Sequence, residues 1–337
     1  MKISLISKYR TQLMGIAILL VALFHSSIKH ANQVIDFSCF CGDMGVDIFF
    51  IISGFGMYYS FQKKVSLKNF FMKRFVRIVP VWICVNMFIQ FYNIGFSKMN
   101  WIYFAKVMTG FLFWLEGNLF FWYIPCILAF YLMTPLFMKM YLKNKFKAYL
   151  VFGIVWILLL GICIIAHNSK YFIFLFRWPA YFLGIYLGEL SFKKIEFSKK
   201  YNWLNALVMI VGIILLNIIR VKNETSSIIR YDYKYFIYVI VAIPMCILAA
   251  QLFQMTEYKF PVLSFLGKIT LEIYLIHEFI LRVMTGKIET YSFDKYLIVY
   301  NLIVFIIAIY IAYLLHKIFD YIGLRILKLL NFDLKCK

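Results

Sequence analysis

Apolar runs of about twenty residues recur along this chain, and they restrict its fold more than any other feature. Wound into a helix at about 1.5 Å per residue, such a run crosses the hydrocarbon core of a bilayer. Hydrophobic residues make up 64% of the chain and charged residues 15%, against about 25% charged in soluble domains. The sequence therefore predicts an all-α bundle of about ten transmembrane helices, at residues 12–29, 44–62, 75–95, 118–138, 148–166, 171–190, 203–219, 235–254, 263–283 and 296–316.

The Lys and Arg residues predict the orientation of this bundle, because short loops rich in them stay in the cytoplasm. With the N-terminus inside, 24 of the 36 Lys and Arg residues fall in inside segments. We expect one multi-pass domain over residues 1–337 in the bacterial cytoplasmic membrane, with both termini cytoplasmic. An eleventh span at 101–117 would lose the charge bias, so we interpret that short, interrupted segment as interfacial or re-entrant.

The sequence does not indicate a nucleic-acid-binding protein, a zinc site or a cleaved signal peptide. The net charge of +21 is explained by topology and not by nucleic-acid binding. The seven Cys residues are scattered and no His or Cys cluster completes a zinc site, so we predict no metal. The first apolar run has no small-residue cleavage site after it, which predicts a transmembrane helix and not a cleaved signal peptide.

Ionisable residues in the apolar runs mark the candidate site, beginning with His25. Fifteen residues separate it from Arg10, which places the two groups roughly 22 Å apart on nearly the same helix face. An imidazole this deep in an apolar helix is costly, and it can act as a general base on a hydroxyl group. The alternative for a lone His is a structural hydrogen bond within the core.

The second span opens on Asp47 and contains the pair Ser53-Gly54. Asp47 either caps the helix near the interface or orients His25, as carboxylates orient catalytic imidazoles. Ser53-Gly54 indicates close helix packing rather than a nucleophile.

Arg74 and Arg77 share a helix face at the cytoplasmic end of the third span. Two guanidinium groups at this spacing can bind phosphates, although ordinary topology-setting charge and contact with lipid phosphates explain them equally well. Arg177 lies within the sixth span, where it is expected to line a cavity or to pair with an acid. Gly184 and Gly188 follow it and indicate tight helix contact.

The ninth span carries Glu272, Tyr274, His277 and Glu278 in one apolar helix. That density of polar groups is hard to reconcile with an inert helix. His277 either serves a substrate site or holds a hydrogen bond between helices.

Taken together, these motifs resemble the acyltransferase-3 family of integral membrane acyltransferases over nearly the whole chain. Each motif alone is weak, but five in order are specific. The resemblance rests on residues 13–25, 45–56, the pair Arg74 and Arg77, residues 177–184, and residues 273–277.

The resemblance implies transfer of an acyl group, usually acetyl from cytoplasmic acetyl-CoA, to a hydroxyl group of a surface glycan. It implies that His25 is the essential histidine and that Arg74 and Arg77 lie near the acyl donor. The chain departs from the family at Met14, where a cation is usual, and Arg10 one turn earlier is the expected substitute. Many members carry an extracytoplasmic esterase-like domain after the last span; here only about 20 residues follow it, so we expect direct delivery to a carbohydrate.

The predicted mechanism places the donor phosphates near Arg10, Arg74 and Arg77 and the thioester near His25, which acts as general base or carries the acyl group transiently. Asp47, or an acid of the ninth span, orients His25. Arg177, Tyr274, His277 and Glu278 are candidates for stabilising the oxyanion or binding a polysaccharide or lipid-linked sugar acceptor. The main alternative is a transporter or flippase for a glycan or small anion, which would show related halves. A structural subunit of a glycan-export complex is a third possibility, and it would not need His25.

Overall fold

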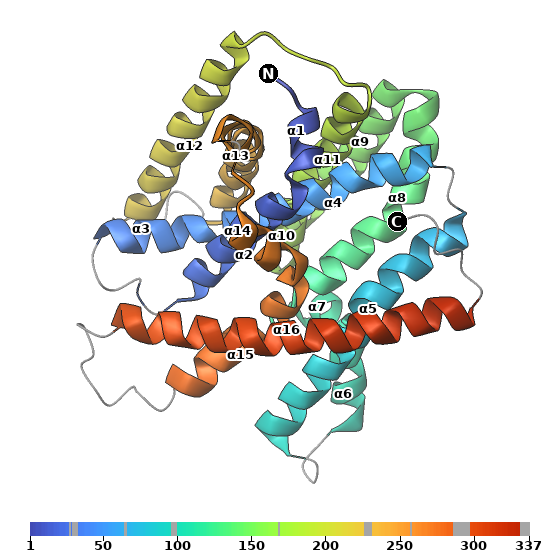
Figure 1. Ribbon diagram of the computed structural model, residues 1–337, viewed down its shortest axis with the longest axis vertical. Coiled ribbons are helices and arrows are strands. Elements are labelled where there is room, and N and C mark those ends of the chain that lie inside the picture. Colours follow the sequence, from blue (N-terminus) through green and yellow to red (C-terminus); the bar gives the residue numbers. More distant parts are fainter. Residues whose placement is uncertain are drawn as a thin grey trace.

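The computed structural model describes residues 1–26, 28, 33–63, 66–95, 100–167, 169–225, 231–256, 258–285 and 297–330. These residues are mostly helical and contain no strand, which confirms the all-α prediction (Figure 1). The α-helices are α1 Ser4–Lys8, α2 Arg10–His25, α3 Gln33–Gly42, α4 Met44–Gln62, α5 Leu67–Ile94, α6 Trp101–Met108, α7 Phe111–Glu116, α8 Tyr123–Lys143, α9 Lys145–Ile165, α10 Phe172–Leu175, α11 Trp178–Phe192, α12 Lys200–Thr225, α13 Lys234–Thr256, α14 Pro261–Lys268, α15 Thr270–Thr285 and α16 Leu297–Leu329.

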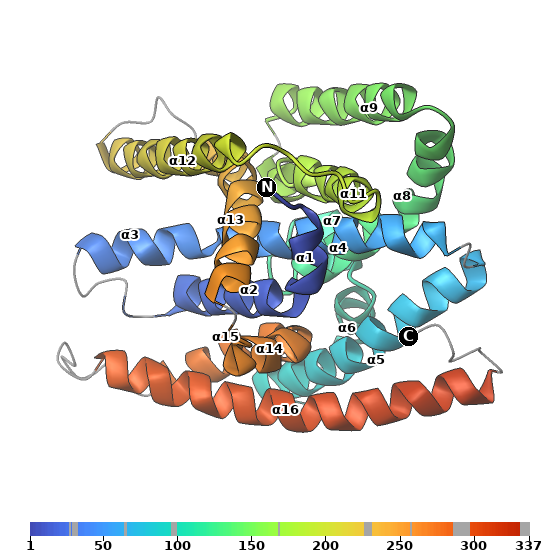
Figure 2. The same cartoon turned by 45° about the horizontal axis from the view of Figure 1, so that its top comes forward.

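The helices differ in how much of their apolar surface the protein itself covers. Helices α9 and α12 lie along one edge of the molecule and α16 along the opposite edge, with α2 and α4 between them (Figure 2). Only 17% of the most apolar window of each edge helix is buried, against 78% in the segment Ser169–Phe192 that includes α11. An apolar helix exposed on most sides is a membrane span, so α9, α12 and α16 face lipid and α11 belongs to the core.

Seven helices in the described part of the chain are long and apolar enough to cross a membrane, which supports a multi-pass membrane protein. Helix α2 is apolar but has only 16 residues. The prediction of a continuous span at 263–283 is wrong, because α14 ends at Lys268 and α15 begins at Thr270. Just before this break, a Cβ atom on Gly267 would lie 1.8 Å from the carbonyl oxygen of Thr11, so α14 crosses the start of α2 at very short range.

Several boundaries differ from those predicted. Helix α3 was not expected and leads almost directly into α4 (Figure 2). Helix α16 has 33 residues and continues well beyond the predicted end of the tenth span. The segment 101–117 forms the short helices α6 and α7, separated at Gly110, whose φ of +74° favours glycine. Neither short helix is long enough to span a bilayer.

Close helix packing was predicted at Gly54, Gly184 and Gly188, and the structure shows that these glycines bring α4 and α11 into backbone contact. A Cβ atom on Gly54 would lie 2.0 Å from the carbonyl oxygen of Tyr181, and one on Gly184 would lie 2.3 Å from that of Ile51. Small residues allow this approach in membrane helices, where packing and not the hydrophobic effect drives association. Helix α4 is thereby buried along most of its length, and it can hold charged groups away from lipid.

Contacts between chain segments support their predicted relative sidedness. Lys2 pairs with Glu196 at 3.1 Å, and Lys145 and Lys193 both pair with Glu189, so these predicted inside segments lie together. At the other end of the bundle, the predicted outside residues Arg220 and Asp36 form an ion pair. Which of the two ends faces the cytoplasm remains a prediction from the charge bias.

Candidate functional site

His25 is the last residue of α2 and lines a cavity of about 300 Å³ at the end of the bundle away from Lys2. The helix ends there because Ser26 adopts an extended conformation and donates its hydroxyl hydrogen to the carbonyl oxygen of Leu23, at 2.6 Å. Residues from distant parts of the chain complete the lining of the cavity. Among them are Asp43, Phe120, Trp122, Tyr235, Tyr274 and Glu278.

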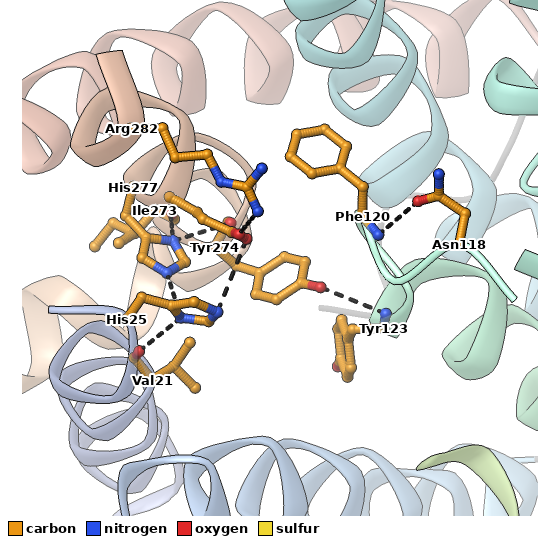
Figure 3. Close-up of polar contacts among 10 residues, drawn as sticks. Val21, His25, Asn118, Phe120, Tyr123, Ile273, Tyr274, His277 and Arg282 are labelled. Carbon is orange, nitrogen blue, oxygen red and sulfur yellow. Dashed lines mark hydrogen bonds and ion pairs between the residues drawn. The ribbon is translucent and has the colours of Figure 1, made fainter. Parts of the chain in front are cut away.

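A second histidine contacts His25. The Nε2 atom of His277 in α15 lies 3.1 Å from Nδ1 of His25, and the two rings meet edge to face (Figure 3). The Nδ1 atom of His277 lies 2.9 Å and 3.0 Å from the carbonyl oxygens of Ile273 and Tyr274. The structure thus brings together two residues that the sequence analysis had treated separately.

These contacts select the tautomers of the two neutral rings. Carbonyl oxygens only accept hydrogen bonds, so the proton of His277 resides on Nδ1 and its Nε2 accepts. Nδ1 of His25 must then carry a proton, which it can share between His277 and the carbonyl oxygen of Val21, 3.0 Å away. The Nε2 atom of His25 is left with a free lone pair, which is the form that a general base requires.

Glu278 lies beside that free nitrogen. Its Oε2 atom is 3.8 Å from Nε2 of His25, too far for a hydrogen bond but close enough to stabilise a protonated imidazole ring. Arg282, one turn further along α15, forms an ion pair with Glu278. An acid of the ninth predicted span is therefore next to His25.

Asp47 does not take that place. Both it and Arg177 are fully buried, and Nε of Arg177 lies 3.6 Å from Oδ1 of Asp47. The other end of the guanidinium group is 2.8 Å from Oδ1 of Asp43. Asp47 therefore pairs with Arg177 and does not orient His25. This pairing agrees with the expectation that Arg177 lies next to an acid.

Asp43 connects this ion pair to the cavity, and the sequence analysis missed it because it lies just before the predicted second span. It lines the cavity, and Lys234, which is also buried, lies 4.0 Å from its Oδ2 atom. Arg177 sits against the cavity residues Trp122 and Tyr235, 4.7 Å and 4.8 Å from their ring centres. Arg177 therefore shapes the cavity wall through its neighbours.

Tyr274 presents a hydroxyl group to the cavity from α15. Its oxygen accepts a hydrogen bond from the backbone N–H of Tyr123, at 3.4 Å (Figure 3). The hydroxyl hydrogen has no acceptor among the described residues. It can donate to an oxygen atom that develops negative charge.

Two arginines lie toward the opposite end of α2 and α4. The guanidinium group of Arg10 packs on Gly56, where a Cβ atom would lie 3.2 Å from Nη2. Arg74 donates to the carbonyl oxygen of Phe70 at 2.7 Å and to the sulfur of Met57 at 3.1 Å, while its Nε is buried without a partner. Neither forms an ion pair with a described residue, so both retain positive charge for an anion. Met14, at the position where the family usually has a cation, is partly buried and packs against the core.

Arg77 has a different environment from Arg74. Its two terminal nitrogens lie 2.5 Å and 3.1 Å from the oxygens of Glu272, which is fully buried and also 3.1 Å from Nδ1 of His316. Such a bidentate pair is strong and leaves little of the guanidinium group for another anion. The structure therefore separates the two arginines that the sequence spacing had grouped.

Among the described residues, no three His, Cys, Asp or Glu side chains are placed to hold a metal ion together. Comparison with known proteins gives one family: a model described as an acyltransferase domain matches residues 12–317. No curated protein and no solved structure matches the chain.

Proposed function

The chain belongs to the acyltransferase-3 family, and from that premise we propose that it transfers an acetyl group from cytoplasmic acetyl-CoA to a hydroxyl group of a cell-surface polysaccharide or its lipid-linked precursor. Family membership makes it a membrane acyltransferase and so favours an enzyme over a transporter, a flippase or a structural subunit. The finer proposal is supported above all by one observation: His25 lines a cavity together with Glu278, and its Nδ1 faces Nε2 of His277, which leaves Nε2 of His25 as the basic nitrogen.

The donor is proposed to enter from the end of the bundle that holds Arg10 and Arg74. Acetyl-CoA carries its phosphates at one end of a long flexible arm and its thioester at the other. Arg10 and Arg74 offer two guanidinium groups without an acidic partner among the described residues. Along α2, Arg10 and His25 are roughly 22 Å apart, so the arm can run beside the helix while the phosphates stay at the arginines.

The acceptor hydroxyl is proposed to react in the His25 cavity. Its proton passes to Nε2 of His25 while its oxygen attacks the carbonyl carbon of the thioester. The carbon–sulfur bond then breaks, and the departing thiolate takes the proton back from Nε2. In the alternative route, His25 first receives the acetyl group and then passes it to the acceptor.

The surrounding groups fit the charges that this reaction develops. Glu278, 3.8 Å from Nε2 of His25, stabilises the imidazolium form. The hydroxyl hydrogen of Tyr274 is available for the negative oxygen of the tetrahedral intermediate. His277 holds the reactive tautomer of His25 and does not itself need to touch the substrate.

The test is NMR of the surface polysaccharide from cells with and without this chain, supported by transfer of label from radioactive acetyl-CoA to that polysaccharide in purified membranes. O-acetyl signals should be lost without the chain and restored by the wild type but not by His25→Ala. Loss of the polymer with unchanged acetylation of what remains would overturn the proposal in favour of transport.

A further inference from the structure

A polar crevice of about 500 Å³ adjoins the His25 cavity and takes no part in the mechanism above. The two spaces share Leu119, Phe120 and Arg282 in their linings, so only these side chains lie between them along the loop before α8. Figure 3 places Phe120 and Asn118 across the site from the histidine pair. A molecule that reacts at His25 can therefore extend past Phe120 into this crevice.

Amide side chains dominate the crevice, and helix α5 contributes a row of them. Asn86, Gln90 and Asn93 are spaced so that they follow one face of the helix, which is unusual within a membrane span. Gln90 and Asn93 line the crevice together with Asn118, and Asn86 lines a smaller cavity that shares Gln90 with it. A row of amide side chains within a membrane span is energetically costly unless the amides form hydrogen bonds.

Two of these amides are buried and have polar atoms without a hydrogen-bond partner among the described residues. Gln90 is 8% exposed and makes no hydrogen bond with any described residue. Asn86 is 1% exposed, and its Oδ1 atom has no partner, while its Nδ2 donates to the carbonyl oxygen of Val107. Buried polar groups in native proteins are normally satisfied, so unpartnered ones beside an open space point to a ligand.

The lining identifies the chemistry of that ligand. Amides both donate and accept hydrogen bonds, which matches the hydroxyl groups of a sugar, and the rings of Tyr103 and Phe120 offer apolar faces to its C–H groups. No acidic residue lines the crevice in the part of the chain described, and the one cation, Arg282, is paired with Glu278. This lining does not suit a metal ion or a polyphosphate.

We propose that the crevice binds a neutral sugar ring next to the one that is acetylated, so that the acceptor is an oligosaccharide of at least two rings. This inference rests on the proposed function. It adds a subsite on α5 and the loop before α8, and it assigns acceptor length as a determinant of activity.

The test uses fragments of one, two and three sugars, prepared from the de-O-acetylated surface polysaccharide of the source cell. With radioactive acetyl-CoA, kcat/KM of the wild type should rise at least tenfold from one sugar to two. Gln90→Leu should lower this two-to-one ratio about tenfold, the value of a hydrogen bond to a buried polar group. Asn93→Ala, at an exposed site, should lower it in the same direction.

Gln251→Leu is the matched control, because Gln251 is a partly buried amide of α13 that donates to the carbonyl oxygen of Ile247 in its own helix. It should leave the ratio unchanged. A ratio near one in the wild type, or an equal loss with all fragments in Gln90→Leu, would overturn the subsite.

A binding measurement keeps this inference separate from the proposed reaction. Saturation-transfer NMR of the two-sugar fragment with the His25→Ala protein should detect binding without acetyl-CoA. Titrated in the same way, Gln90→Leu in the His25→Ala background should bind the fragment about tenfold more weakly, whereas Gln251→Leu should not change the affinity. An affinity unchanged by Gln90→Leu overturns the subsite even if the enzyme acetylates the polymer. A wild-type protein that binds the fragment but transfers no acetyl group overturns the proposed function alone.

Discussion

The Nε2 atom of His277 lies 3.1 Å from Nδ1 of His25, so helix α15 selects the tautomer of a ring on helix α2. The backbone carbonyls of Ile273 and Tyr274 hold the proton of His277 on its far nitrogen. His25 therefore donates the proton on Nδ1 to His277 and presents the lone pair of Nε2 to the cavity. This relationship leads directly to the first two predictions.

Replacing His25 with Ala should lower transfer of acetyl from acetyl-CoA by about a hundredfold to ten-thousandfold, the range for loss of a positioned general base. The measurement is label transfer by purified protein at matched membrane levels. His167→Asn is the control, since His167 is exposed and Asn tolerates its φ of +49°. Retained transfer in His25→Ala would refute the mechanism.

Replacing His277 with Leu should lower kcat by about tenfold to a hundredfold, because His25 then loses the acceptor that selects its tautomer. His277→Gln should recover much of kcat, since its amide oxygen can accept the same hydrogen bond. KM for acetyl-CoA should stay near the wild-type value in both variants. A purely structural role would instead reduce protein level or thermal stability in both variants and leave kcat per folded molecule unchanged.

Replacing Arg10 or Arg74 with Ala should raise KM for acetyl-CoA about tenfold to a hundredfold, as expected for loss of a charged hydrogen bond to phosphate. The effect on kcat should be small, and Lys at either position should restore part of the binding. Steady-state kinetics over a range of acetyl-CoA concentrations decides the matter. An unchanged KM in both Ala variants would remove the arginines from the donor site.

Replacing Arg77 with Ala should act mainly on stability, because it leaves the buried carboxylate of Glu272 with His316 as its remaining ion-pair partner. A loss of about 1–3 kcal/mol is expected for a buried group that loses its partner. It should appear as a lower midpoint of thermal unfolding in detergent, with KM for acetyl-CoA little changed. Adding Glu272→Gln should recover part of that loss. A large rise in KM without loss of stability would return Arg77 to the donor site.

Replacing Gly184 with Val should prevent correct assembly, since even a Cβ atom there would lie 2.3 Å from the carbonyl oxygen of Ile51. Backbone cannot move away as a flexible side chain can, so α4 and α11 must separate. Gly161→Val is the control, because no atom lies within 4 Å of a Cβ at that lipid-facing position of α9. Size-exclusion profiles and heat stability of the two variants should differ clearly.

Much of the fold could be predicted because apolar runs, glycine pairs and loop charges are local signals. Gly54 and Gly184 predicted close packing of their helices, although not that the two helices pack on each other, and the candidate residues His25 and His277 follow from their depth in apolar runs. The break at Ile269 was not predicted from the sequence, because it lies where α14 crosses the start of α2, and that contact joins segments far apart in the chain.

It was harder to predict which site residues contact one another than to predict which residues belong to the site. Spacing placed Arg74 and Arg77 on one helix face, but it carries no information on Glu272, 195 residues away, which engages only Arg77. In the same way, Asp47 was considered as a partner of His25 because carboxylates orient catalytic imidazoles. The pairing with Arg177 depends on how α4 packs against α11, which no local pattern encodes.

The shortness of α2 has a consequence for how work is divided between enzyme and cofactor. Its 16 residues extend about 24 Å, less than the roughly 30 Å of a typical hydrocarbon core. A short helix held between longer ones thins the barrier that separates two aqueous compartments. Under the proposed function, the CoA arm is therefore long enough to carry the acetyl group across this thinned barrier. The protein needs no large conformational change, whereas a transporter would have to alternate between two conformations.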